Sequence, residues 1–290
     1  MTFQQTIIQF FEVPILVVKR FKSDRLPRHA AALAFNSLLA LAPMAAIALS
    51  LFSLFSGFEQ LGTSFEDFIY QFLVPTASDD LKTYFEQFAG QAGKLTFFGL
   101  IFFFLTALVL LASIEQSFND IWRVKEGRSM TSRLTVYWAL ISLGPFLMGG
   151  SLMLSTYLLS LSVAAGENIH SFGLLLTPFL LETLAFLLLY LVMPNVRVSL
   201  VHALVGALVA SSLFEFTKSA FRAYIVNYAN YDVVYGALST LPILLIWIYL
   251  SWVIALIGAE LVAVLQERHL LELKVGKIFG AQKVDQATGD

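Results

Sequence analysis

The residues best suited to chemistry in this sequence are three ionisable side chains inside one long apolar segment. Glu215, Lys218 and Arg222 recur at spacings of three and four, so a helix would place them on one stripe. Ser211, one turn before Glu215, extends that stripe. An ionisable group surrounded by lipid costs several kcal/mol unless it is paired or faces water. The stripe therefore predicts a polar site that lines a transport path or carries protons.

A fourth ionisable residue, Glu182, lies in the preceding apolar segment. Counted from a membrane boundary near Leu174, helix rise puts Glu182 about 12 Å deep. Counted from the same surface of a core roughly 30 Å thick, Glu215 is about 10 Å deep. Because the depths match, we predict that both glutamates meet Lys218 in a polar chamber, with Arg222 as a further candidate. A buried ion pair that only fixes helix register fits the same pattern, and the sequence does not separate the two.

Three other polar residues are weaker candidates. Asn36 lies in the first apolar segment, where an amide more often hydrogen-bonds across helices than binds a ligand. Glu115 and Glu260 lie near the ends of their segments, where a long side chain can extend to water.

Several other kinds of chemistry lack the residues they need. The chain has no cysteine and four scattered histidines, so neither a thiolate nucleophile nor a catalytic zinc site is predicted. It has no GxxxxGK[ST] nucleotide loop, no HExxH helix and no GxSxG nucleophile turn. We therefore expect no metal, no cofactor, no ATPase and no enzymatic activity.

The elements that must position these residues are long and apolar. Hydrophobic residues make up 58% of the 290, charged residues only 13%, and the mean hydropathy is +0.77. Charges this sparse cannot cover a water-facing surface. A helix needs roughly 20 apolar residues to cross a bilayer, and several stretches meet that requirement. They run approximately over residues 30–55, 95–117, 134–163, 174–193, 200–225 and 237–265.

The predicted fold class is all-α, a polytopic membrane bundle of about six transmembrane helices with additional amphipathic helices at the interface. We expect residues 1–29 to form an amphipathic segment on the inner membrane face and 30–265 to form the membrane domain. Residues 266–290 are expected to be a cytoplasmic tail that is partly disordered. The loop 57–93 repeats apolar residues at helical spacing beside acidic ones, which predicts short helices on the outer surface or a lid over a cavity.

Positive charge falls on alternate connections between these stretches. Lysines and arginines precede the first stretch, separate the second from the third, and follow the sixth, whereas the opposite loops hold only Lys82 and Lys94. The positive-inside rule therefore places both termini in the cytoplasm. The net charge of −2 provides no field for nucleic acid, so the expected partners are membrane lipids. The oligomeric state stays open.

Short motifs follow one another in a recognisable order. They are Ala30 to Phe35 (AAALAF), Phe118 to Arg123 (FNDIWR), Tyr231 to Gly236 (YDVVYG) and Gly258 to Leu261 (GAEL). Over about residues 25–268 this set resembles the YihY/BrkB family of bacterial inner-membrane proteins, and the turn Pro194 to Arg197 fits its proteobacterial YihY branch. The resemblance implies a six-span inner-membrane protein with no agreed activity. Members often carry a ribonuclease BN label, which the scattered histidines here do not support. The BrkB name is associated with serum resistance, and some relatives are linked to lipid export.

Three functions remain open at this point. The first is a transporter or lipid-handling permease without its own ATPase, which moves a lipid or a small solute past Glu182, Glu215 and Lys218. The second is a non-transporting scaffold or assembly factor, whose basic tail and 123–133 loop dock partners or anionic headgroups. The third is an enzyme such as a ribonuclease, for which no catalytic constellation is present.

Overall fold

The computed structural model describes residues 3–53, 97–140, 167–228 and 240–287, and the regular elements within these ranges are α-helices. The helices are α1 (Phe3–Ser23), α2 (Leu26–Ser53), α5 (Phe97–Ile121), α7 (Glu167–Val192), α8 (Leu200–Tyr228) and α10 (Thr240–Ala287). A further helix occupies residues 130–140. This agrees with the predicted all-α class.

Each predicted apolar stretch that lies in the described residues falls on a helix, although α7 begins earlier and α10 ends much later than the stretch it covers. α2, α5, α7, α8 and α10 cover the first, second, fourth, fifth and sixth stretches, and the helix over residues 130–140 covers the start of the third. Within the described residues, Leu200–Ile225 and Leu241–Arg268 are long and apolar enough to cross a membrane, and Pro178–Val192 is a shorter apolar helix. The predicted loop helices at 57–93 lie outside the described residues.

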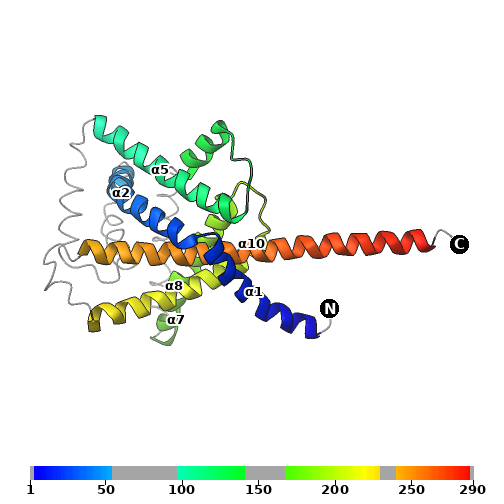
Figure 1. Ribbon diagram of the computed structural model, residues 1–290. Helices are drawn as coiled ribbons and strands as arrows, with labels where there is room; N and C mark the ends of the chain where they lie inside the picture. The colour runs from blue at the N-terminus through cyan, green and yellow to red at the C-terminus, as the bar shows by residue number, and fades with distance from the viewer. Residues whose placement is uncertain (1–2, 54–96, 141–166, 229–239, 288–290) are drawn as a thin grey trace.

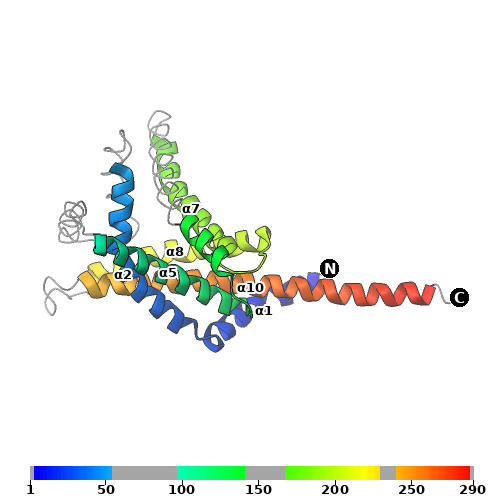
Figure 2. The same cartoon turned by 90° about the horizontal axis from the view of Figure 1, so that it is seen from above.

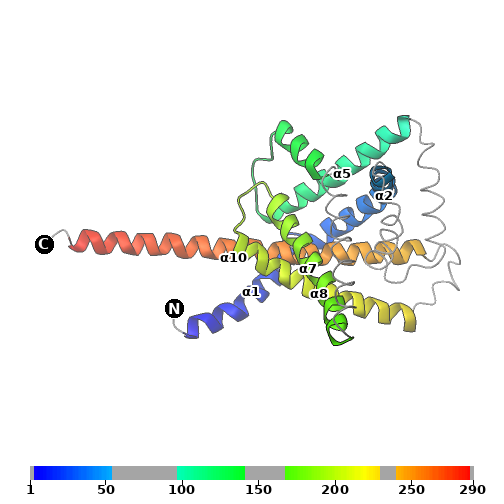
Figure 3. The ribbon, with the colours of Figure 1, turned by 180° about the vertical axis from the view of Figure 1, so that it is seen from behind.

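α10 is the central helix of the bundle. It packs against α1, α2 and α8, while α2 packs against α5 and α7 against α8. Figure 1 shows α2 and α5 on one side of α10 and α8 on the other, and Figure 3 shows the same arrangement from behind. α10 also continues to Ala287, through the segment assigned to the tail, and extends well beyond the other helices (Figure 2).

The close approach of α8 and α10 depends on small residues. Gly206 and Gly258 lie at the crossing, with Ala207 and Ala259 buried beside them. A Cβ on Gly258 would overlap the hydroxyl of Tyr190, which donates a hydrogen bond to the Ala255 carbonyl at 3.0 Å. Interfaces of membrane helices favour small residues because they let the backbones approach. α7, α8 and α10 are therefore locked together at this level.

Two helices end on arginines in the left-handed conformation. Arg25 follows α1 with φ 54° and Arg123 follows α5 with φ 53°. After α5, the amide of Val124 donates to the Asn119 carbonyl (2.9 Å) and that of Arg123 to the Asp120 carbonyl (3.1 Å). This hydrogen-bond pair is the Schellman motif, in which glycine is the usual residue. Both turns place their arginine side chains at one end of the bundle, exposed.

We call this the basic end: it contains the α1–α2 turn and the connections 122–129 and 193–199. The best-buried part of the core lies toward it and includes Leu33, Phe118 and Tyr190. Large apolar side chains elsewhere are exposed on the outer faces of the helices, for example Phe35, Leu180 and Phe216. An apolar exterior of this kind suits a lipid-facing surface.

Prolines have different consequences at different helix positions. Pro178 lies inside α7, where it removes a backbone hydrogen bond. Pro242 lies in the first turn of α10, where its missing N–H would have no helical acceptor, so it does not interrupt the helix. Pro145 lies outside the described residues.

Candidate functional site

The structure brings Glu182 of α7 together with Glu215 and Lys218 of α8. The Lys218 Nζ atom donates to Glu182 Oε1 at 2.6 Å and to Glu215 Oε1 at 2.9 Å. Side-chain exposure is 11% for Glu182, 15% for Lys218 and 38% for Glu215. We call these three residues the charged cluster. They join α7 to α8; Glu182 and Lys218 are largely enclosed, whereas Glu215 is partly exposed.

The charged cluster has more acid than base. Two carboxylates share one ammonium, so its formal charge is −1 when all three groups are ionised. The second oxygen of Glu182, Oε2, is buried and has no hydrogen-bond partner among the described residues. A buried acceptor without a donor is costly, because it has lost its water and gained nothing in return.

An aromatic side chain separates the charged cluster from the bundle core. The Lys218 ammonium lies 5.6 Å from the centroid of the Phe214 ring, within the range of a cation–π contact. Phe214 in turn contacts Phe186 of α7 and Trp247 of α10, with ring centroids 6.0 Å and 5.4 Å away. The packing of three helices thus fixes the ring under the ammonium.

A second polar contact joins α7 and α8 one turn nearer the basic end. The hydroxyls of Thr183 and Ser211 are both buried and lie 3.0 Å apart. Ser211 also donates to the carbonyl of Ala207 at 2.9 Å, one turn back on its own helix. Ser211 was among the predicted candidates, whereas Thr183 was not, since a threonine in an apolar helix usually bonds its own backbone. Its position directly after Glu182 was the available signal.

Arg222 is not brought into the charged cluster. Its side chain is exposed one turn beyond Lys218, and the ion pairs of Glu182 and Glu215 with described residues are made by Lys218 alone. The predicted stripe on α8 faces α7 from Ser211 to Lys218, and Arg222 lies beyond the contact.

Asn36 joins two helices of the other half of the bundle. Its amide donates to the hydroxyl of Ser113 on α5 at 2.8 Å. On the neighbouring residue of α2, the Ser37 hydroxyl accepts a hydrogen bond from the indole of Trp252 on α10 at 2.9 Å. These contacts are the helix-to-helix kind that such residues make in membranes.

The expectation that Glu115 and Glu260 extend to water is wrong. Glu115 is 1% exposed and accepts a hydrogen bond from the Tyr137 hydroxyl at 2.6 Å, with Arg133 at 3.3 Å. Glu260 is 0% exposed, and its nearest cation is Arg20, 3.6 Å away. α1 covers Glu260, and the helix over residues 130–140 covers Glu115. The position of each glutamate within its own segment could not reveal this burial.

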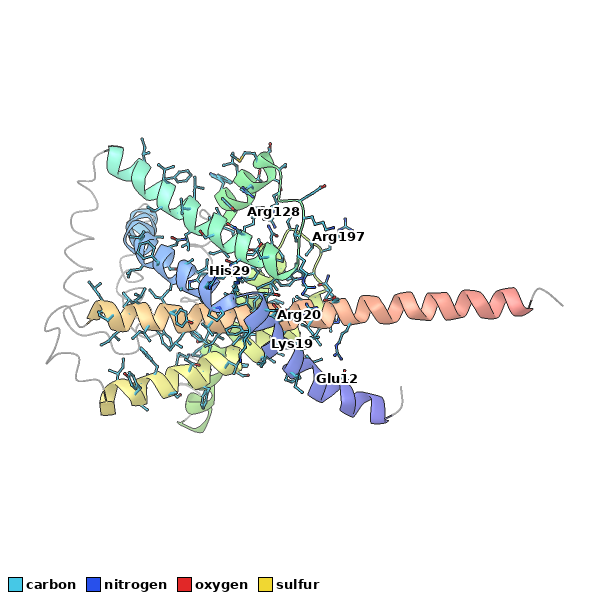
Figure 4. The ribbon with its side chains drawn as sticks, in the orientation of Figure 1. Glu12, Lys19, Arg20, His29, Arg128 and Arg197 are labelled. Carbon is cyan, nitrogen blue, oxygen red and sulfur yellow. The ribbon has the colours of Figure 1, made fainter. Side chains whose placement is uncertain are left out.

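Arg20 links α1 to α10 at the basic end, and Figure 4 shows it where the two helices cross. It pairs with Glu260 and with Glu267, and Arg268 of α10 pairs with Glu12 of α1 at 3.0 Å. Burial alone would lower the pKa of Arg20, but its bond to Glu267 and the charges of the nearby carboxylates raise it above the ordinary arginine value. Arg20 is therefore a permanent cation.

The two connections at the basic end are bonded to each other. The Asn119 side chain accepts from the backbone amide of Asn195 at 2.8 Å, and Arg128 donates to the carbonyls of Val192 and Pro194. Asn119 and Asn195 belong to the FNDIWR and PNVR segments singled out from the sequence. Their hydrogen bond gives both segments a structural role, because it attaches the end of α5 to the α7–α8 connection.

An open depression of about 330 Å³ lies between α8 and α10. It is mostly apolar and is lined by Thr217, Ala220, Phe221, Tyr224, Ile246 and Leu250. At 100° per residue, this face of α8 points away from the face that carries Lys218 and Glu215. The depression and the charged cluster are thus separate features. Among the described residues no group of three or more His, Cys, Asp or Glu is arranged to hold a metal ion.

Comparison with known proteins gives a consistent answer. The family described as virulence factor BrkB matches residues 17–279. A UPF0761 membrane protein of Aeromonas salmonicida is 43% identical over 254 residues, covering 87% of this chain and 88% of the relative. One from Photobacterium profundum is 41% identical over 270 residues, covering 92% and 85%. No solved structure matches. The chain is therefore a membrane protein of the BrkB family, and its curated relatives are called UPF0761 membrane proteins.

Proposed function

We propose that the protein is a transporter or lipid-handling permease without its own ATPase, and that the charged cluster is its working site. It crosses the bacterial inner membrane about six times with both termini in the cytoplasm, because the basic end then lies where the positive-inside rule expects it. The single observation that carries the proposal is the sharing of the Lys218 ammonium between Glu182 and Glu215.

The composition of the charged cluster favours a working site over a structural tie. A tie between α7 and α8 needs one carboxylate for one ammonium, and the Thr183–Ser211 contact already joins these helices. The second carboxylate adds a charge that apolar surroundings penalise. Such residues inside membranes mark substrate and proton paths.

The two carboxylates differ in access, which suggests how the site works. Glu215 is more than three times as exposed as Glu182, and in this scheme it is the carboxylate that receives a proton. Protonated Glu215 no longer competes for Lys218. The ammonium is then available to an anionic group of the substrate, such as a phosphate headgroup, while Glu182 holds it in place. Proton uptake and substrate binding are linked in this scheme, and no nucleotide is consumed.

Liposomes that contain the purified protein and a trace of fluorescent phospholipid provide the test. We expect lipid movement between leaflets above that of empty liposomes, with a rate that responds to a proton gradient. Glu215→Gln should remove the response to the gradient, and Lys218→Met should reduce movement to background. Glu126→Gln, which removes an exposed carboxylate in the 122–129 connection, serves as the control and should behave as wild type.

The proposal fails if wild-type liposomes move no more lipid than empty ones under either condition and also fail to take up labelled small anions. It fails equally if Glu215→Gln and Lys218→Met are folded and as active as wild type. A scaffold that does not transport would give the first result.

A further inference from the structure

We infer that the exposed face of α1 is a docking surface for anionic phospholipid headgroups. Ile15, Val18, Lys19 and Lys22 are all exposed and follow one another at spacings of three, one and three. On a helix they span an arc of about 100°. Exposed aliphatic residues interleaved with lysines suit a helix that rests at the boundary between headgroups and acyl chains, because lysine stems are themselves apolar.

The opposite face of α1 is attached to the bundle, so the orientation of the exposed face is fixed. Val17 is buried, Phe21 packs against the core, and Arg20 pairs with Glu260 and Glu267 of α10. Figure 4 shows Lys19 next to Arg20 on α1, close to where α1 crosses α10. The exposed fractions of Ile15 (68%) and Val18 (60%) are high for aliphatic residues, which water would not favour and acyl chains would.

The charges around this face favour an anionic occupant. Lys19 and Lys22 have no ion-pair partner among the described residues, and exposed Arg25 and Arg28 follow in the turn to α2. The one carboxylate at the edge of the face, Glu12, is occupied by Arg268 at 3.0 Å. The surface is therefore positive, and lysines beside an apolar stripe keep their stems in the hydrocarbon boundary and their ammonium groups among phosphates.

The absence of cysteine from the chain makes the test specific. Val18→Cys in the full-length protein accepts a single environment-sensitive fluorophore. The labelled protein in uncharged detergent is titrated with a short-chain phosphatidylglycerol, with the matching phosphatidylcholine, and with glycerol 3-phosphate. We expect a blue shift that saturates at lower concentration with phosphatidylglycerol than with phosphatidylcholine, that weakens with salt, and that glycerol 3-phosphate does not produce.

Two charge-matched variants locate the effect. At about 1 kcal/mol for each basic residue near a lipid surface, Lys19→Gln with Lys22→Gln should raise the phosphatidylglycerol midpoint roughly thirtyfold. Lys125→Gln with Arg197→Gln removes two exposed charges from the same end but outside α1, and should leave the midpoint unchanged. Ile15→Ser should reduce the blue shift.

Four results would overturn the inference. They are equal midpoints for the two lipids, an equal loss in the two double variants, a full response to glycerol 3-phosphate, and a blue shift that depends on protein concentration without added lipid. The last would assign the face to a second copy of the chain. None of these results depends on whether the protein transports lipid.

Discussion

The charged cluster and the α1–α10 ion pairs use different cations in different surroundings. Between α1 and α10, Arg20 and Arg268 pair with glutamates that include the well-exposed Glu12 and Glu267. Between α7 and α8, the ammonium of Lys218 is largely enclosed among apolar helices. Guanidinium groups hold carboxylates in a fixed fork, whereas an ammonium is a point charge that rotates freely between partners. The first region therefore suits a fixed contact, whereas the second suits the exchange of partners that we propose for the charged cluster.

The largest expected effect comes from removing the shared cation. Lys218→Met leaves two carboxylates without compensation and should lower the free energy of unfolding by about 3–5 kcal/mol. Unfolding by SDS in mixed micelles, followed by the fluorescence of the four tryptophans, measures it. Adding Glu182→Gln should recover most of the stability but none of the transport. If transport returned with stability, the charged cluster would be only a structural tie.

An intermediate effect is expected where a fixed cation faces a buried acid. Arg20→Gln removes the nearest cation of fully buried Glu260, at a cost of about 2 kcal/mol in the same unfolding measurement. The double variant Arg20→Gln with Glu260→Gln should recover much of the lost stability, because no uncompensated carboxylate then remains at position 260. Transport should persist in both variants once they are folded. A loss of transport in stable Arg20→Gln would erase the distinction between the two regions.

The smallest effect should appear at the exposed rim. Arg268→Gln breaks the pair with Glu12, whose side chain is about half exposed, and should cost less than about 1 kcal/mol. The difference between variant and wild type should shrink as salt is raised, because water and ions screen such pairs. A cost as large as that of Arg20→Gln, independent of salt, would show that α1 is held more tightly than its contacts indicate.

Local pattern was enough to predict part of the site. Hydropathy located the helices, since the bilayer demands long apolar segments. The meeting of Glu182 with Lys218 was predicted from matched depth in the two helices, and the shared face of Glu215 and Lys218 from their spacing along α8. Depth and angular position both follow from residue number in a regular helix, so they can be obtained without knowing how the helices pack.

Features that depend on distant elements could not be predicted in this way. Glu260 is buried because α1 returns to cover it, and Glu115 because Tyr137 and Arg133 approach from a later helix. Arg222 shares the stripe of Lys218, but its side chain is exposed and lies outside the cluster. The pairing of α7 with α8 depends on the topology of the bundle, and the periodicity of a single helix carries no information about its neighbours.

The length of α10 turns its crossing with α8 into a fulcrum. Gly258 divides the helix into arms of about 27 Å toward Thr240 and about 44 Å toward Ala287, at 1.5 Å per residue. Any tilt about that pivot would move the far tip roughly 1.6 times as far as the opposite end, by the same count. A small tilt of α10 would therefore cause a larger displacement of its C-terminal end, which extends beyond the other helices and could contact soluble molecules.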